Sequence, residues 1–270
     1  MGSPLPSSCA HFGTGAAFPV VTRQPKTCAG FLLEPVKVPA SPYELKVTES
    51  QAEREAAFKL VHEAYVRAGL MARHAMGMRV MKHHLLDQTD VLVVKRHGKV
   101  VFTSSLVREG EFGLPLESLF ATEVNSLRQR GLQVAEVSCL ASDSALEDKT
   151  QRFELFVEMI GLLFQTARFH GVDRVLLAVH PRHAKVYQRM FGCELCSDVK
   201  EYAAVQGNPA VLCSHDFAQL DQTRYCLYDK AYRVKYGVID LLGKRMSDAE
   251  KRYFAQAVTS HACSMLPVAA

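Results

Sequence analysis

The sequence predicts an α/β fold in which a mixed central sheet is covered by helices on both faces. Helical periodicity alternates with β-rich runs over residues 43–217. The run RVLLAVH, residues 174–180, is almost wholly apolar and lies between two helical segments, which is typical of a strand buried on both faces. With 270 residues and 48% hydrophobic content, the chain can bury one large core or two small ones.

Three regions are expected along the chain. Residues 1–42 hold seven of the eleven prolines and much Ser, Gly and Thr, which predicts an extended or loosely packed arm with one strand near residues 30–33. Residues 43–217 are expected to form the main domain. Residues 218–270 are expected to form a helical extension packed on that domain.

The first half of the main domain should run helix, hairpin, helix, strand. We assign a capping box to residues 48–51, followed by Phe58, Val61 and Tyr65 at helical spacing. Residues 76–86 fit either a short helix or a mobile loop. The remaining elements are a hairpin over 91–107 that turns at His97–Gly98, a helix over 116–131 and a strand over 134–140.

The second half should continue with helices and strands in alternation. Asp148 is placed to cap a helix that ends at Gly171, and Pro181 is placed at the first position of a helix that ends at Gly192. The buried stripe of the first of these helices is expected to be Phe153, Phe156, Val157, Ile160, Leu163, Phe164 and Ala167. Strands follow at 199–205 and 210–217, and a second capping box lies at Ser247–Glu250.

Composition excludes several classes of protein. The net charge of +4 is too small to indicate binding to duplex DNA, although it suits an acidic partner. No apolar run approaches the length of a membrane span, and the first residues lack a secretory signal, so we expect a soluble cytoplasmic protein. The eight cysteines are scattered, which indicates reduced thiols, and the isolated pair Cys193 and Cys196 is weak evidence for zinc or redox chemistry. No metal site is expected.

The segment AVHPRHAKVYQRMFGCE resembles the corresponding strand, turn and helix of the GNAT acyltransferase fold. The matching residues are Ala184, Tyr187, Gly192 and Cys193. The resemblance implies a GNAT-like fold with extra C-terminal helices, and it implies that Tyr187 protonates the leaving thiolate. The alternative is that Tyr187 and Met190 are only the buried face of a short helix.

The loop that follows the strand at 134–140 departs from the usual GNAT pattern. Members that use coenzyme A bind its pyrophosphate on a glycine-rich turn at a helix N-terminus. Residues 142–149 contain no glycine, and they carry Asp143, Glu147 and Asp148, which would repel a pyrophosphate. Either the protein is not a transferase, or the acyl group arrives on a carrier that needs no such turn.

Residues 106–141 resemble the N-acyl amino acid synthases of the FeeM type, which are relatives of the acyl-homoserine-lactone synthases. The shared features are a G-L-P turn at 113–115, an L-R-x-x-G helix end at 127–131 and an E-x-S strand at 136–138. HPRHAKVYQRMFG, NPAVL and residues 58–66 also match, so the similarity spans about residues 44–220. It implies a long-chain acyl donor on acyl carrier protein, an amino acid acceptor and no other cofactor. Cys139 stands where the homoserine-lactone branch usually has Arg, which argues against an adenosylmethionine substrate.

The aminolysis of a thioester assigns roles to several residues. It needs a neutral amine, a stabilised oxyanion and a proton for the leaving thiolate. Glu136 is either the proton acceptor or a structural carboxylate paired with Arg or His. Backbone N–H groups of residues 137–140 can face the oxyanion, and Ser138, Cys139 and Leu140 are expected to contact substrate.

The remaining candidates are cationic side chains and histidines. Arg67, Arg73 and Arg79 are the candidates for the acceptor carboxylate. His180 is a candidate for substrate binding, although capping or surface positions suit His180 and His183 better than metal binding, and His83–His84 are expected in an exposed loop. The cations expected to dock an acidic carrier protein are Lys149, Arg152, Arg168, Arg182, Lys185 and Arg189.

Two other functions remain open from the sequence. One is an ordinary GNAT enzyme that uses acyl-coenzyme A through an atypical phosphate site. The other is a non-catalytic protein of this fold that senses lipid or acyl carrier protein. No nucleic acid partner is expected in any of these cases.

Overall fold

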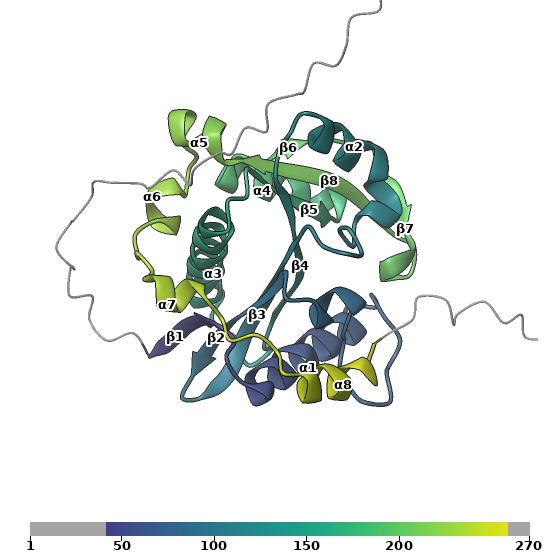
Figure 1. Ribbon diagram of the computed structural model, residues 1–270. Helices are drawn as coiled ribbons and strands as arrows, with labels where there is room; N and C mark the ends of the chain where they lie inside the picture. The colour runs from purple at the N-terminus through teal and green to yellow at the C-terminus, as the bar shows by residue number, and fades with distance from the viewer. Residues whose placement is uncertain (1–41, 259–270) are drawn as a thin grey trace, which may run out of the picture. The chain divides into compact units, whose positions relative to one another are not determined.

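The computed structural model describes residues 42–258, so the arm predicted for residues 1–42 lies outside the described residues except for its last position. Eight strands form a mixed sheet in the order β1-β2-β3-β4-β5-β8-β6, with β7 paired to β8 (Figure 1). Among these strands β4 and β5 are the one parallel pair. The strands are β1 Tyr43–Val47, β2 Thr89–Arg96, β3 Lys99–Arg108, β4 Val134–Ser142, β5 Arg174–Val179, β6 Glu194–Leu195, β7 Lys200–Tyr202 and β8 Asn208–Asp216.

Helices cover both faces of this sheet, as predicted. Figure 1 shows α3 on one side of β3 and β4, and α1 with α8 on the other. The helices are α1 Gln51–Arg67, η1 Lys82–Leu85, α2 Glu117–Gln129, α3 Lys149–Phe169, α4 Pro181–Phe191, η2 Ala203–Val205, α5 Phe217–Thr223, α6 Tyr228–Ala231, α7 Val238–Leu241 and α8 Asp248–Ala255. Each face has its own buried apolar cluster, one under α3 and α4 and one under α1 and α2. None of the described helices has the length and apolar character needed to cross a bilayer.

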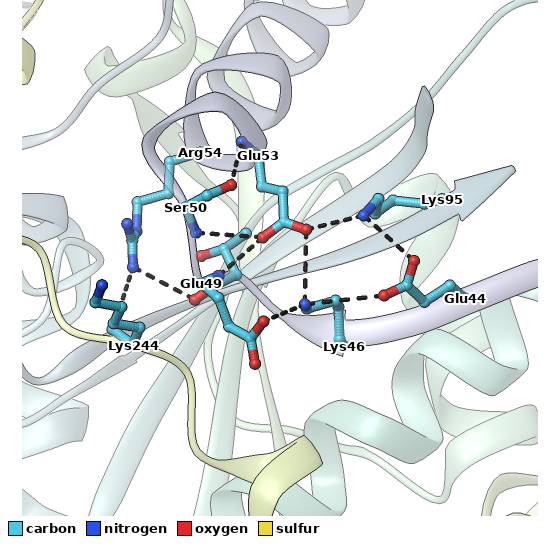
Figure 2. Close-up of polar contacts among 9 residues, drawn as sticks. Glu44, Lys46, Glu49, Ser50, Glu53, Arg54, Lys95 and Lys244 are labelled. Atoms are coloured by element: carbon cyan, nitrogen blue, oxygen red, sulfur yellow. Dashed lines mark hydrogen bonds and ion pairs between the residues drawn. The ribbon is translucent and has the colours of Figure 1, made fainter. Parts of the chain in front are cut away.

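The capping box of α1 lies two residues later than predicted (Figure 2). Ser50 Oγ accepts a hydrogen bond from Glu53 N at 3.3 Å, and Glu53 Oε2 accepts from Ser50 N at 3.3 Å. Thr48 is unavailable as a cap because its N–H still donates to Val91 O, at 2.8 Å, in continuation of the β1–β2 pairing. Lys95 also donates to Glu53, at 3.0 Å, so the start of α1 is tied to β2.

A buried arginine of α1 ties this helix to the C-terminal helices. Arg54 is 3% exposed and donates to Glu250 at 2.7 Å and to the carbonyl oxygen of Lys244. The second Glu250 oxygen belongs to the capping box with Ser247 that the sequence predicted for α8. The helices after residue 217 therefore pack on the domain, while the domain boundary itself stays a prediction.

Several predicted elements are confirmed, and three further local predictions are wrong besides the position of the capping box. The hairpin, the Asp148 cap and Pro181 at the first position of α4 are confirmed. Phe153 is 37% exposed rather than part of the buried stripe. The strand expected at 199–205 stops at Tyr202 and becomes η2. His83 and His84 are buried, not exposed, because this segment packs between α1 and the sheet.

Candidate active site

The sheet opens between its two parallel strands. Ladder pairs between β4 and β5 run from Val134 and Arg174 to Glu136 and Leu176 and end there, although both strands continue. A bulge in β4 lies directly beyond this point: Cys139 and Leu140 together face one residue of β3, and Cys139 has a φ of 54°. Bulges bend a strand and increase its twist. The bend therefore accompanies the separation of β4 from β5.

A cavity of about 1450 Å³ occupies this opening. Its walls come from both faces of the sheet, because Phe156 and Tyr187 line it from α3 and α4 while Tyr65 and Tyr202 line it from the opposite face. The cavity therefore passes through the plane of the sheet. Its volume exceeds the roughly 300–1,000 Å³ of usual small-molecule sites, which suits two substrates that meet end to end.

Glu136 lies at the edge of the opening and lines the cavity. Its side chain is buried, and Oε2 accepts a hydrogen bond from Leu116 N at 2.7 Å. Burial raises the pKa of Glu136 to about 8, although the hydrogen bonds from Leu116 and Ser138 act in the opposite direction. No Arg or His of residues 42–258 forms an ion pair with it, so the alternative of an ion-paired structural carboxylate is wrong.

The bulge residues lie where the sequence placed substrate contacts. Ser138, Cys139 and Leu140 all line the cavity. Burial raises the pKa of the Cys139 thiol, and the Arg79 guanidinium offsets only part of this effect. Cys139 therefore stays a protonated thiol near neutral pH, which suits a contact residue better than a nucleophile.

Tyr187 also lines the cavity, from the α4 side. Burial raises its pKa to about 12, so the hydroxyl keeps its proton under all physiological conditions. Its ring packs against Phe156 and Phe191, with centroids 6.3 and 6.2 Å away. Met190 and Tyr187 both pack against the apolar cluster under α3 and α4, but only Tyr187 also lines the cavity, so its catalytic role stays a prediction.

Only one of the three candidate arginines reaches the cavity. Arg67 and Arg73 are exposed, whereas Arg79 is 5% exposed and lines the cavity. Its guanidinium stacks over Tyr65 at 4.8 Å and donates to Ala204 O at 3.5 Å, while Nε has no hydrogen-bond partner. No carboxylate of residues 42–258 pairs with it. An unpaired buried cation costs on the order of several kcal/mol, so an anionic ligand that reached Arg79 would compensate it.

The histidines fall into two groups. His180 is the N-cap of α4, where Nδ1 accepts from Arg182 N at 3.2 Å, and both His180 and His183 line the cavity. His83 lies on the cavity wall too, with its ring 5.9 Å from that of Phe112.

Sequence reasoning missed His83, Phe112 and Tyr202 as cavity residues, since no local pattern marks them. Across the described part of the chain, no group of three His, Cys, Asp or Glu side chains is arranged to hold a metal.

The start of α3 is already occupied by a carboxylate. Asp148 Oδ1 accepts from Thr150 N at 2.8 Å and from Gln151 N at 3.2 Å. Asp143 in the same loop pairs with Lys99 at 2.7 Å. A pyrophosphate would have to displace the Asp148 side chain before it could reach these N–H groups, and the choice of donor stays a prediction.

The cations predicted to dock a carrier protein surround one mouth of the cavity in part. Arg182 is exposed and lines the cavity, and Arg152 lies one helical turn before Phe156 of the cavity wall. Arg168 does not belong to this set, because it pairs with Asp221 and donates to Tyr232 Oη at 2.8 Å. The predicted cations without an ion pair among residues 42–258 are Lys149, Arg152, Arg182, Lys185 and Arg189.

Comparison with known proteins places this site in a wider context. A family model described as N-acyl amino acid synthase FeeM matches residues 56–216. The solved structure of FeeM, an N-acyl amino acid synthase from uncultured soil microbes, is similar with a TM-score of 0.58 and 21% identity, over 68% of this chain and 95% of that one. Among curated proteins none matches.

Two acyl-homoserine lactone synthases are also similar in structure. BjaI, described as coenzyme-A-dependent and solved with SAM and isopentyl-CoA, has a TM-score of 0.51 and 12% identity over 79% of this chain and all 100% of its own. MesI, also described as coenzyme-A-dependent, has a TM-score of 0.50 and 14% identity over 72% and 98%. These likenesses confirm the predicted GNAT-like acyltransferase fold.

Proposed function

The chain belongs to the FeeM family of N-acyl amino acid synthases and is an acyltransferase, and from this premise we propose that it moves a long-chain fatty acyl group from acyl carrier protein to the amino group of an amino acid. The observation that carries the acceptor class is that two buried groups of opposite character, Arg79 and Glu136, line one cavity without pairing with each other. A guanidinium binds a carboxylate and a carboxyl group binds an amine. An α-amino acid offers both.

The acceptor lies, in this proposal, on the face of the sheet that carries α1 and α2. Its carboxylate binds Arg79 and its amino group faces Glu136. An α-amino group titrates near pH 8 in peptides and higher in a free amino acid, whose carboxylate stabilises the ammonium, so the acceptor arrives charged and must lose a proton. The pKa of Glu136 is raised to about 8, which makes it a better proton acceptor than an ordinary carboxylate. One proton leaves the ammonium before attack, and a second leaves the nitrogen as the amide forms.

The thioester lies in the opening between β4 and β5, reached from the α3 and α4 face. The amine nitrogen attacks the carbonyl carbon, a C–N bond forms, and the C–S bond then breaks. Beyond Glu136, β4 stays paired with β3 but has no ladder partner on β5, so the N–H groups of this segment that point toward β5 are available to the oxyanion. Ser138, Cys139 and Leu140 belong to this segment and line the cavity, so their side chains contact the reacting groups.

Tyr187 acts on the leaving sulfur as a hydrogen-bond donor. Its pKa of about 12 exceeds the roughly 8.5 of a thiol, so complete proton transfer from Tyr187 would cost about 5 kcal/mol. The thiolate therefore takes up one of the two protons that the nitrogen releases. Tyr187 stabilises the negative charge on sulfur by donating a hydrogen bond. Over the whole reaction one proton goes to the thiol and one to solvent.

The choice of a carrier protein as donor rests on the start of α3 and on the rim of the cavity. Asp148 occupies the N–H groups that a pyrophosphate would need, and no glycine offers another approach. Arg182 and the unpaired cations near it offer an acidic carrier protein a docking surface, and a pantetheine arm can then enter the cavity. No further cofactor is part of the proposal.

The test compares two donors with the same acyl chain. The purified protein is incubated with a mixture of amino acids and either acyl carrier protein or coenzyme A loaded with a long-chain acyl group, and N-acyl products are measured by mass spectrometry. We expect efficient turnover with the carrier and slow or no turnover with coenzyme A. Equal rates would assign an ordinary coenzyme-A enzyme, and tight carrier binding without any product would assign a sensor.

A further inference from the structure

We propose that Arg128 is a positioning residue that fixes the orientation of Glu136 through Glu117 and the Gly113–Pro115 turn. The inference rests on the proposed function for the role of Glu136 in proton transfer. Arg128 lies in the last turn of α2 and does not line the cavity, so it acts through other groups.

The guanidinium of Arg128 holds two carboxylates at once. Nε and Nη2 donate to Glu109 at 3.0 and 2.8 Å, which is a two-pronged bond at the end of β3. Nη1 donates to Glu117 Oε2 at 2.7 Å, and Nη2 donates to Glu117 Oε1. Glu109 and Glu117 flank the connection from β3 to α2, so a single planar cation closes both ends of that loop.

Glu117 passes this constraint to the turn. Its Oε1 also accepts from Leu114 N, so the carboxylate sits inside the bend of the chain. Gly113 has a φ of 62°, and a Cβ there would lie 2.5 Å from Glu117 Oε1, closer than real contacts allow. The positive φ favours glycine at 113, and the Glu117 carboxylate fills the space beside it and accepts from Leu114 N.

The Gly113–Pro115 turn then fixes the orientation of the Glu136 carboxyl group. Leu116 N, directly after the turn, donates to Glu136 Oε2 at 2.7 Å, and Leu116 is fully buried. Tyr202 Oη donates to Pro115 O at 3.3 Å and braces the turn from β7. A displaced turn would move or remove the one backbone N–H that fixes the carboxyl group of Glu136, among the contacts that the described residues make.

Arg128 also changes the charge around Glu136. The titratable groups that act on Glu136 come from four elements: Glu117 from α2, Tyr65 from α1, Tyr202 from β7 and Cys139 from β4. Burial raises the pKa of both tyrosines and of the thiol, so these three are neutral near pH 7 and Glu117 is the charged neighbour of this group. Burial favours the neutral form of Glu117, and the hydrogen bonds from Arg128 and Leu114 outweigh it and lower its pKa. Arg128 therefore keeps Glu117 ionised while it offsets the charge.

The test measures the pH dependence of kcat/KM with the acyl carrier protein donor in Arg128→Gln, Arg128→Lys and Arg130→Gln. Arg130 is the matched control, since it follows α2, is exposed and has no ion pair among residues 42–258. We expect Arg128→Gln to lower kcat about 10-fold or more, to leave the KM for the donor within about twofold, and to raise the acidic midpoint by about half a pH unit or more. Arg128→Lys should lie between, because it keeps the charge and loses the fork, and Arg130→Gln should match the unmodified protein.

A second variant keeps the proposal testable if Arg128→Gln does not fold. Glu117→Gln keeps an oxygen for Leu114 N and removes the negative charge, so the acidic midpoint should fall instead of rise. Unchanged midpoints in Glu117→Gln and in every folded Arg128 variant, or an activity loss that only follows the folded fraction measured by circular dichroism, would overturn the positioning role. Absence of acyl transfer by the unmodified protein would instead count against the proposed function.

Discussion

Arg79 and Glu136 face the same cavity from a loop before η1 and from β4, both almost fully buried, and neither forms an ion pair with any charged side chain of residues 42–258. Buried groups of this kind destabilise a fold unless a ligand or a hydrogen bond compensates them. The two unpaired groups are therefore typical of a binding site, in which a bound ligand supplies a partner to each.

Glu136→Gln tests the proton acceptor. The amide keeps the oxygen that accepts from Leu116 N and cannot take up a proton at neutral pH. We expect kcat to fall on the order of 10² to 10⁴-fold, while the affinity for acyl carrier protein stays within about twofold. Steady-state kinetics and a binding titration check the two parts. Full activity in a folded variant would assign proton removal to water or another residue.

The raised pKa of Glu136 also predicts how stability depends on pH. In the unfolded chain this carboxyl ionises near its ordinary value of 4.5, and in the folded protein it ionises near 8. The unfolded state therefore binds fewer protons than the folded state between these values, so this group makes the folded state lose stability as the pH rises from about 4.5 to about 8. Glu136→Gln should remove this loss. The free energy of unfolding of the variant minus that of the unmodified protein should therefore grow by on the order of 1–4 kcal/mol from pH 5 to pH 8.5. Urea unfolding at both pH values measures it, and a constant difference would mean an ordinary pKa.

Arg79→Met tests the carboxylate site. Charge-assisted hydrogen bonds are worth about 1.5–3 kcal/mol, so we expect the KM for the amino acid to rise about 10- to 150-fold, with the KM for the donor little changed. An amino acid amide lacks the carboxylate, so with the unmodified protein its KM should exceed that of the amino acid by the same factor. Arg79→Met should raise the KM of the amide little further. Arg67→Gln and Arg73→Gln are matched controls on exposed arginines, and an effect of equal size there would move the carboxylate site out of the cavity.

The double reversal Arg182→Glu and Lys185→Glu tests carrier docking. Both side chains are exposed on α4, and neither forms an ion pair among the described residues. We expect a higher KM for acyl carrier protein and a weaker dependence of kcat/KM on salt, because rim charges mainly set the association rate. Reversal of Arg130, which directly follows α2, and of Arg252 in α8 is the control, because both are exposed and form no ion pair among residues 42–258. Equal effects of the two double variants would contradict a docking site on α4.

Much of the fold could be predicted because it depends on local patterns. Pro181 can enter a helix only near its start, and residues 174–180 are too apolar for any exposed position, so both were placed correctly. The capping box was misplaced because residues 48–51 and 50–53 both satisfy the same pattern, and only the pairing of Thr48 with β2 decides between them. His83 and His84 were misplaced because histidine has no fixed burial preference, and here Ser105 and the backbone of Met81 satisfy His84.

The site was predictable in part for a related reason. Glu136 stands out as the one acid in an apolar strand, and Tyr187 follows from a recognisable helix. Arg79 could not be selected from three arginines, because its burial depends on contacts with Tyr65 and with Ala204, more than one hundred residues away. The bulge at Cys139 had no signal at all, since a non-glycine residue at positive φ is set by its neighbours in space rather than by its own preference.

Because the cavity passes through the sheet, separate stretches of the sequence form the walls that face the two proposed substrates. The wall on the α1 and α2 side, proposed for the acceptor, is built largely by residues between Tyr65 and Ala121, with a second contribution from residues 202–210. The wall on the α3 and α4 side, proposed for the donor, is built largely by residues between Phe156 and Tyr187. A substitution in one stretch changes one wall and leaves the other intact, while the shared strand β4 keeps the chemistry. If each wall binds the substrate proposed for it, the specificity for the amino acid and the specificity for the acyl chain can change in separate evolutionary steps.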